Sequence, residues 1–348
     1  MSSSTPTTSS AADSADLATA DALATEGRFL DAIDVLTAVN RIERSDAVEQ
    51  RLAALRNEAF AEVAGTQPGW PWEDEPPRPR PEIAGLPSIG RGELNAETLR
   101  DNILTYGCAY VRELLTPDQC AELRRVIDNA FDAYDMYRAG TTKSEVPPAW
   151  RSFPEHDTAE MAGTRHWVRE GGGVLTGDSP RALFTFLETM DEVGIRDLVA
   201  AYLGERPVLS LGKSTLRRVS PTGPGDWHQD GAFLGTDLRV INVWVTLSDC
   251  GVTSPGLEVV PRRLPGLAPS GTHGTWFDWG VAPDMALEAA GDVATVAPHY
   301  RAGDALLFDE LFLHRTDVTP DMNGDRYAIE TWMFAPSLYP GDQTPIVW

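Results

Sequence analysis

Lysine is almost absent from the sequence. The chain has 29 basic residues, and all of them except Lys143 and Lys213 are arginines. Acidic residues number 52, so the formal net charge is −23. A negative field of that size repels nucleic acid and anionic membranes, and neither is expected as a partner. Because lysine is so rare here, Lys213 stands out as a candidate functional cation.

Cysteines and long apolar runs are also scarce. The three cysteines, Cys108, Cys120 and Cys250, lie far apart and form no Cys-x-x-Cys pair. We therefore expect buried thiols in a reducing compartment. No apolar run reaches the ~18 residues of a membrane-spanning helix. The first residues lack the basic and apolar regions of a signal peptide, so the expected location is cytoplasmic.

The N-terminal part divides into a tail and a helical module. Residues 1–13 contain too few apolar side chains to offset the entropy of ordering, and we expect a disordered tail. Residues 14–65 show apolar spacings of three and four and resemble a tetratricopeptide-type unit. One such unit cannot bury its apolar stripe alone. It should dock on its own chain, form a homodimer or bind a protein partner, and the sequence leaves these three open.

Prolines then separate this module from a larger domain. Residues 66–93 are predicted to be an extended linker, and residues 94–348 a single domain. That domain begins with a helix to about Tyr106, a strand at 108–112 and a helix capped by Thr116 and Gln119. Two more helices are expected at 180–190 and 193–203. Strands dominate from Val208 onward, which predicts an α+β domain with a mainly β core.

Two segments show no regular pattern. Residues 138–178 are expected to form a lid, a binding loop or a disordered excursion. Residues 270–292 form a second irregular stretch that contains several aromatic residues. We expect substrate choice to reside in these two segments. The side chains that could face a substrate in the first segment are His156, Arg165, His166, Trp167 and Arg169, and the aromatic ones in the second are Trp276, Phe277 and Trp279.

A His-x-Asp pair, His228 and Asp230, is the clearest sign of chemistry. On a strand, alternation would put both side chains on one side, about 7 Å apart. His314 follows an apolar strand, and Arg326 opens another strand twelve residues later. Two imidazoles and one carboxylate can hold Fe(II) on one octahedral face and leave three positions for other ligands. The short motif is weak alone, so the prediction depends on the whole set.

Four stretches resemble the phytanoyl-CoA dioxygenase family of Fe(II)/2-oxoglutarate oxygenases, over roughly residues 95–336. They lie at 110–123, 227–230, 243–261 and 302–316. The resemblance implies a double-stranded β-helix, a jelly-roll or cupin-like fold with flanking helices and a metal at its open mouth. It also implies Fe(II), 2-oxoglutarate and O₂ as cofactors. Where the family commonly has Pro-Gly-Ser-His, this chain has Pro-Arg-Arg-Leu-Pro-Gly, so the acyl-CoA substrate of the namesake is not carried over.

The resemblance also implies roles for individual residues. His228, Asp230 and His314 are the implied iron ligands. Arg326 is the implied partner of the distal carboxylate of 2-oxoglutarate, a task that suits a forked guanidinium. The other implied cosubstrate contacts are Lys213, Thr215, Gln229, Trp244 and Thr316.

Strand alternation adds three candidate substrate contacts, Glu330, Trp332 and Arg217. Residues 330 and 332 should face the side of Arg326, and residue 217 the side of Lys213. An isolated carboxylate inside a barrel is costly. Glu330 is therefore expected either to contact the substrate or to pair with a nearby arginine.

Together these features predict a dioxygenase that hydroxylates a C–H bond of a small molecule and releases succinate and CO₂. Asp230 favours hydroxylation, because halogenating relatives need a non-ligating residue at that position. Two alternatives stay open. The same metal-binding barrel would serve a non-oxidative isomerase or lyase, and a scaffold could work through residues 14–65 with a vestigial site.

Overall fold

A computed structural model of the chain describes residues 11–64, 78–79, 85–153, 159–223, 225–235, 238–271 and 274–348. The first ten residues of the predicted tail lie outside these ranges, as do most of the predicted linker and His156. The helices are α1 (Ala11–Thr25), α2 (Phe29–Ile42), α3 (Asp46–Glu58), α4 (Phe60–Val63), α5 (Ala96–Tyr106), α6 (Pro117–Arg138), α7 (Ala159–Glu170), α8 (Pro180–Glu192), α9 (Ile195–Leu203), α10 (Gly231–Leu234) and α11 (Pro283–Ala290).

Two facing sheets form the core of the larger domain. The strands are β1 (Ser88–Gly90), β2 (Cys108–Arg112), β3 (Gly173–Leu175), β4 (Val208–Val219), β5 (Trp227–His228), β6 (Val240–Thr246), β7 (Gly256–Val259), β8 (Gly280–Val281), β9 (Ala305–Phe308), β10 (His314–Asp317), β11 (Arg326–Phe334) and β12 (Pro345–Val347). The large sheet has the order β1-β2-β9-β6-β11-β4-β12, with β3 also on β4, and the small sheet has the order β7-β10-β5-β8. Among the strands of the described residues, only the β1–β2 pairing is parallel. The predicted α+β jelly-roll is confirmed.

The large sheet has two different faces because side chains alternate along each strand. One face packs against α5, α6, α8 and α9 and carries Ile329 and Met333 of the central strand β11. The other face looks toward the small sheet and carries Ala328 and Trp332. The helix that follows Thr116 has the predicted capping box with Gln119. The candidate site residues lie on the inner face, between the sheets.

The segment 138–178 is not an irregular loop, and that expectation was wrong. It contains α7 and the strand β3, whose residues 173–175 pair with residues 215–217 of β4. Ion pairs hold α7 in place: Arg165 Nε lies 2.6 Å from Asp178 Oδ2, and Arg169 Nη2 lies 2.7 Å from Asp135 Oδ2. A helix held largely by charged partners shows little apolar periodicity, so its sequence pattern was weak.

Other boundaries also differ from expectation. The edge strand β1 lies inside the segment predicted as linker, and α1 begins at Ala11. The irregular stretch at 270–292 contains β8 and the helix α11.

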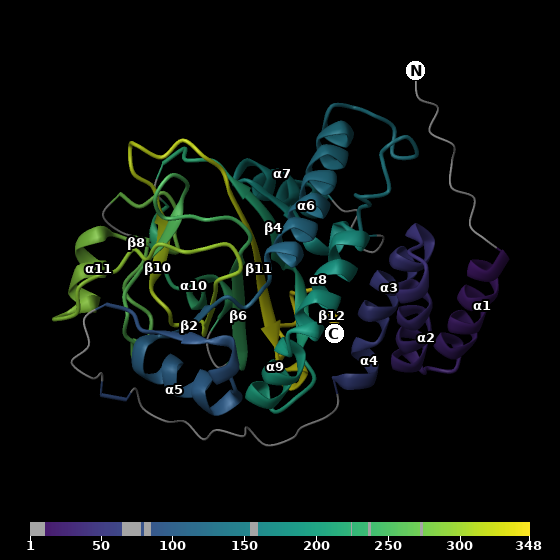
Figure 1. The fold of residues 1–348 in the computed structure, drawn as a ribbon, viewed down its shortest axis with the longest axis horizontal. Helices are drawn as coiled ribbons and strands as arrows, with labels where there is room; N and C mark the ends of the chain where they lie inside the picture. The colour runs from purple at the N-terminus through teal and green to yellow at the C-terminus, as the bar shows by residue number, and fades with distance from the viewer. Residues whose placement is uncertain are drawn as a thin grey trace.

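The N-terminal helices pack against the rest of the chain (Figure 1). Their apolar core includes Phe184 of α8 and Val347 of β12. Arg56 Nη1 of α3 donates to the carbonyl of Val347 at 2.9 Å, and Arg181 of α8 forms an ion pair with Glu49 of α3 at 2.9 Å. Of the three options left open by the sequence, docking on its own chain is therefore observed.

Candidate active site

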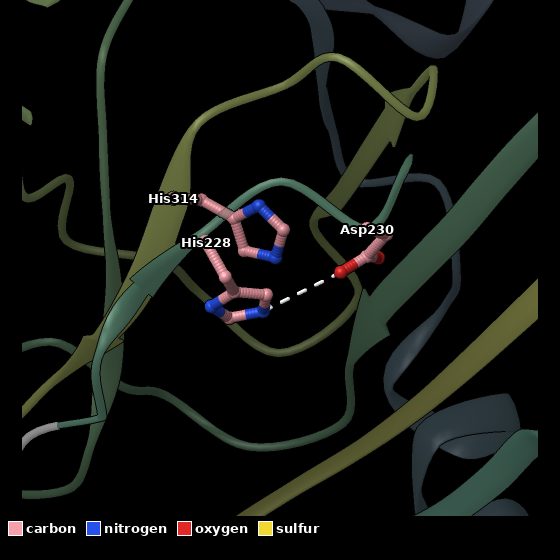
Figure 2. Close-up of side chains that lie close together, drawn as sticks. All are labelled: His228, Asp230 and His314. Carbon is pink, nitrogen blue, oxygen red and sulfur yellow. Dashed lines mark ion pairs between the residues drawn. The ribbon is translucent and has the colours of Figure 1, made fainter. Parts of the chain in front are cut away.

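The three candidate metal ligands meet at the mouth between the sheets. His228 of β5 and His314 of β10 are directly opposite each other in the small sheet. Asp230 does not continue the strand as expected. Its backbone is helical (φ −66°, ψ −21°) at the turn into α10, and this turn brings the carboxylate beside the imidazoles. Figure 2 shows the result: His228 Nε2 lies 3.4 Å from Asp230 Oδ1, and the ligand atoms all lie within 4.8 Å of one another.

Both imidazoles are held in the form that a metal requires. The Nδ1 atom of His228 donates to the carbonyl of Asp226 at 2.9 Å, and that of His314 donates to the carbonyl of Phe312 at 3.0 Å. A carbonyl can only accept, so each ring carries a proton on Nδ1, and its Nε2 is the atom placed to bind a metal. Burial lowers the pKa of His314 to about 3, so this ring stays neutral.

Trp332 orients the carboxylate ligand. Its indole Nε1 donates to Asp230 Oδ2 at 2.9 Å, which leaves Oδ1 facing His228. Burial raises the pKa of Asp230 to about 6, because nothing in the dry site fully offsets its charge. A divalent cation would supply the missing charge, so the donor set fits a metal such as Fe(II). Trp332, which was predicted as a substrate contact, is only 1% exposed and contacts Asp230.

Arg326 carries a buried positive charge. It is 4% exposed, and its Nη1 donates to the carbonyl of Gly256 at 2.9 Å. Among the described residues, its Nε has no hydrogen-bond partner and no carboxylate forms an ion pair with it. A buried unpaired charge is costly. The distal carboxylate of 2-oxoglutarate fits this position.

Neighbouring polar atoms on the same inner face are also unsatisfied. Thr215 Oγ1 and both amide atoms of Asn242 are buried without a partner in the described part of the chain. Thr215 is directly opposite Glu330, and Asn242 is directly opposite Trp332, so all four side chains share this face. These groups fit an oxygen-rich cosubstrate between the sheets.

The remaining predicted cosubstrate contacts lie beside different parts of the site. Trp244 lies 5.8 Å from the Arg326 guanidinium, measured to its ring centre. Lys213 Nζ lies 4.4 Å from the ring centre of Phe233, and burial lowers the pKa of this amine. Thr316 lies on β10, two residues after His314.

Gln229, which the resemblance implied as a cosubstrate contact, makes three hydrogen bonds to the backbone of neighbouring loops. Its Nε2 donates to the carbonyls of Gly266 and Leu311, at 3.1 and 2.6 Å, and its Oε1 accepts from the amide of Ala268 at 2.7 Å. Both amide hydrogens are used, so the side chain ties two loops to the site.

The sequence model of the phytanoyl-CoA dioxygenase (PhyH) family matches residues 103–318, more than half of the chain. The chain belongs to this family. As a PhyH-family protein it is an oxygenase that uses Fe(II), 2-oxoglutarate and O₂, and the donor set and Arg326 described above fit the first two. No curated protein matches the sequence.

Several solved structures are similar to this PhyH oxygenase at low sequence identity. EctD from S. alaskensis, solved with 2-oxoglutarate and 5-hydroxyectoine, is 17% identical with a TM-score of 0.48, over 78% of this chain and 87% of that one. AviO1 from Streptomyces viridochromogenes Tue57 is 18% identical with a TM-score of 0.44, over 71% and 98%. SnoK, a non-heme alpha-ketoglutarate-dependent carbocyclase from nogalamycin biosynthesis, is 15% identical with a TM-score of 0.46, over 71% and 87%.

Glu330 of the PhyH oxygenase is paired, which is one of the two outcomes expected for it. Its Oε2 accepts from Arg217 Nε at 3.1 Å and from Nη2 at 2.9 Å. Burial opposes ionisation of Glu330, but Arg217 outweighs it and the pKa of the carboxyl is lowered. The pair lies on the inner face.

Three of the α7 side chains predicted to face a substrate are engaged elsewhere. Arg165 and Arg169 form the ion pairs described above, and His166 Nδ1 lies 3.1 Å from Arg138 Nη2. Trp167 is 55% exposed and meets Phe277.

Among the described residues, no helix is long and apolar enough to cross a membrane.

Sequence reasoning missed two residues beside the metal site. The backbone carbonyl of Asp226 accepts a hydrogen bond from His228. Its carboxylate accepts one from the backbone amide of Trp276 and so holds the loop that contains Trp276. Phe233 lies between Lys213 and Trp279. Asp226 precedes the His-x-Asp motif by two positions, but its carboxylate binds amides fifty residues away, so no local signal reveals its role.

Proposed function

We propose that this PhyH-family oxygenase hydroxylates a C–H bond of a small-molecule substrate and releases succinate and CO₂. The proposal includes His228, Asp230 and His314 as the iron ligands. Its main support is the set of three converging donors, two imidazoles and one carboxylate, whose ligand atoms lie within 4.8 Å of one another. The neighbouring Arg326, buried and without an ion-pair partner in the described residues, supports a carboxylate-bearing cosubstrate.

The chain's own residues prepare the site for this reaction. Iron bound with 2-oxoglutarate and O₂ supplies the oxidising chemistry. The carbonyls of Asp226 and Phe312 hold the two imidazoles in the ligating tautomer, and Trp332 holds the carboxylate of Asp230. Arg326 binds the distal carboxylate of the cosubstrate.

Packing around that carboxylate site keeps water away. Trp244 and Tyr300 meet edge-on with ring centres 5.1 Å apart, and both are nearly fully buried beside Arg326. Water exclusion strengthens the charge interaction of the guanidinium. Lys213, Thr215 and Thr316 are proposed as further cosubstrate contacts.

An anaerobic titration tests the cofactor part of this proposal. Fe(II) and 2-oxoglutarate added to metal-free protein should produce a weak visible charge-transfer band, and air should then release succinate. The variants H228A and D230A should lose both signals, and R326A should bind iron but lose the band. His299→Ala is the matched control, because His299 is an exposed histidine outside the site. Normal iron binding without a band would contradict the oxygenase and favour a non-oxidative isomerase or lyase.

Product masses test hydroxylation itself. The loaded enzyme is incubated with metabolite extracts, and products that form only when 2-oxoglutarate is present are identified by mass spectrometry. A gain of one oxygen is expected. A product of unchanged mass, or one that has lost two hydrogens, would contradict hydroxylation while leaving the oxygenase chemistry intact.

A further inference from the structure

Aromatic side chains form a continuous row that starts at the metal site. Phe277 and Trp279, in the loop before β8, stack with ring centres 4.3 Å apart and planes 5° apart. Trp279 meets His228 at 5.2 Å and Phe233 of α10 at 5.6 Å. Phe277 meets Trp167 of α7 edge-on at 6.2 Å. We call Trp167, Phe277, Trp279 and Phe233 the aromatic row.

Much of the aromatic row is open to water. Trp167 is 55% exposed and Phe277 is 37% exposed. None of these side chains belongs to the buried core, so packing of the fold does not account for them. Clustered exposed aromatic groups mark binding surfaces more often than scattered single ones do. Their position next to His228 places that surface where oxidation would occur.

Asp226 fixes the loop that carries Phe277 and Trp279 relative to the metal site. Its Oδ2 accepts from the backbone amides of Trp276 and Phe277, at 2.6 and 3.3 Å, while its carbonyl accepts from His228 Nδ1. Gly280 leaves room for the carboxylate, because a Cβ there would lie 2.7 Å from Oδ2. One residue thus fixes both the loop and the first imidazole, and the aromatic surface is pre-organised.

Charged groups border the row on its other side. Lys213 Nζ lies over the ring of Phe233 at 4.4 Å, and the Arg217–Glu330 pair lies on the same strand face as Lys213. Arg217 Nη1 also reaches the carbonyl of Gly171, just after α7, at 3.4 Å. The mouth therefore has an aromatic side and a polar side.

We propose that Phe277 and Trp279 bind the substrate and that the substrate presents a flat conjugated ring to them. Aromatic rings favour offset-stacked and edge-to-face contacts, and the aromatic row offers both kinds. Asp226 is a positioning residue, because it acts through the loop. This inference rests on the proposed function, since it takes the neighbouring metal site as the place of oxidation.

Two probes with the same carbon skeleton test the preference for a flat ring. Binding of 2-naphthol and of its puckered analogue decahydro-2-naphthol is measured by calorimetry, anaerobically, with protein loaded with Fe(II) and 2-oxoglutarate. The naphthol should bind about fivefold more tightly, the effect of one favourable aromatic contact. Equal affinities would overturn the proposal.

Variants test whether the aromatic row is the site that binds naphthol. Trp279→Leu and Phe277→Leu should each weaken naphthol binding about fivefold, and Asp226→Ala should do the same with iron affinity unchanged. Trp276→Leu is the matched control, because Trp276 makes no ring contact with any described residue and should bind naphthol like the wild type. Thermal unfolding checks that each variant is folded. If both Trp279→Leu and Phe277→Leu bind naphthol normally, the aromatic row is not the site.

The two proposals fail in different ways. If the 2-oxoglutarate-dependent charge-transfer band is absent, the proposed oxygenase function is contradicted. The same naphthol titration on iron-loaded protein without 2-oxoglutarate still tests the aromatic row, and a retained preference lost in Trp279→Leu supports it.

Discussion

Asp230 depends on a single neutral donor for its orientation. Trp332 is buried among aromatic rings, with Phe308 at 5.9 Å, so its indole cannot swing away from the carboxylate. Second-shell donors of this kind set the direction of a ligand's lone pairs. The side chain that strand alternation assigned to the substrate thus supports the metal ligand.

Replacing Trp332 by Phe should weaken iron binding about tenfold, the lower end of the effect of losing an outer-shell hydrogen bond. The ring remains, so packing changes little. Metal affinity is measured by anaerobic Fe(II) titration. Trp150→Phe is the matched control, because Trp150 is equally buried but packs on Tyr134 and Tyr137 away from the site. Unchanged affinity in Trp332→Phe would show that Asp230 needs no orienting donor.

At the scale of elements, α7 and β3 complete the wall of the large sheet beside the site. Asp178 accepts from Arg165 Nε and Nη2, at 2.6 and 2.9 Å, and from the amide of Phe153 at 2.8 Å. Both partners of this ion pair are almost fully buried. The pair attaches α7 to the segment after β3, and α7 in turn carries Trp167 of the aromatic row.

Asp178→Asn should lower the free energy of unfolding by about 3 kcal/mol, because it removes the negative partner of a buried, hydrogen-bonded ion pair. Urea denaturation measures the change. Glu122→Gln in α6 is the control: its ion pair with Arg125 is exposed, and such pairs contribute at most about 1 kcal/mol. A similar small effect of both substitutions would contradict a stabilising role for the buried pair.

At the scale of the whole molecule, the N-terminal helices cover α8 and the C-terminal strand. We propose the division into a tail at 1–13, a helical module at 14–65, a linker at 66–93 and the oxygenase domain at 94–348. The contacts of Arg56 and Asn57 with the carbonyls of Val347 and Pro345 tie the module to the C-terminal strand β12. The module therefore serves as a cover for the domain.

Removing residues 1–64 should expose Phe184 and Val347 and lower the thermal unfolding temperature by roughly 5–10 °C. Binding of a fluorescent apolar dye should rise. In the full-length chain, Ile42→Ala is the control, because Ile42 is 89% exposed on the module and its loss should change neither signal. A truncated chain with unchanged stability and oligomeric state would identify the module as a separable adaptor.

Local sequence pattern determined much of this protein. Strand alternation and helix periodicity depend on neighbouring residues, so the helices α5, α6, α8 and α9, the strand β2 and a mainly β core were predictable. The jelly-roll arrangement of that core was implied by the family resemblance. The candidate ligands and Arg326 followed from their order along the chain. The geometry observed around them agrees with that assignment, which the titration and variants above test.

Only the tertiary structure decided how the site is supported. Asp226 contacts the amide of Trp276 fifty residues away, Gln229 contacts the carbonyl of Leu311 at a separation of 82, and Trp332 contacts Asp230 at a separation of 102. The helical backbone of Asp230, which ends the strand after His228, was likewise decided only by the tertiary structure. Such contacts depend on which segments the fold brings together, and no periodicity along the chain records them.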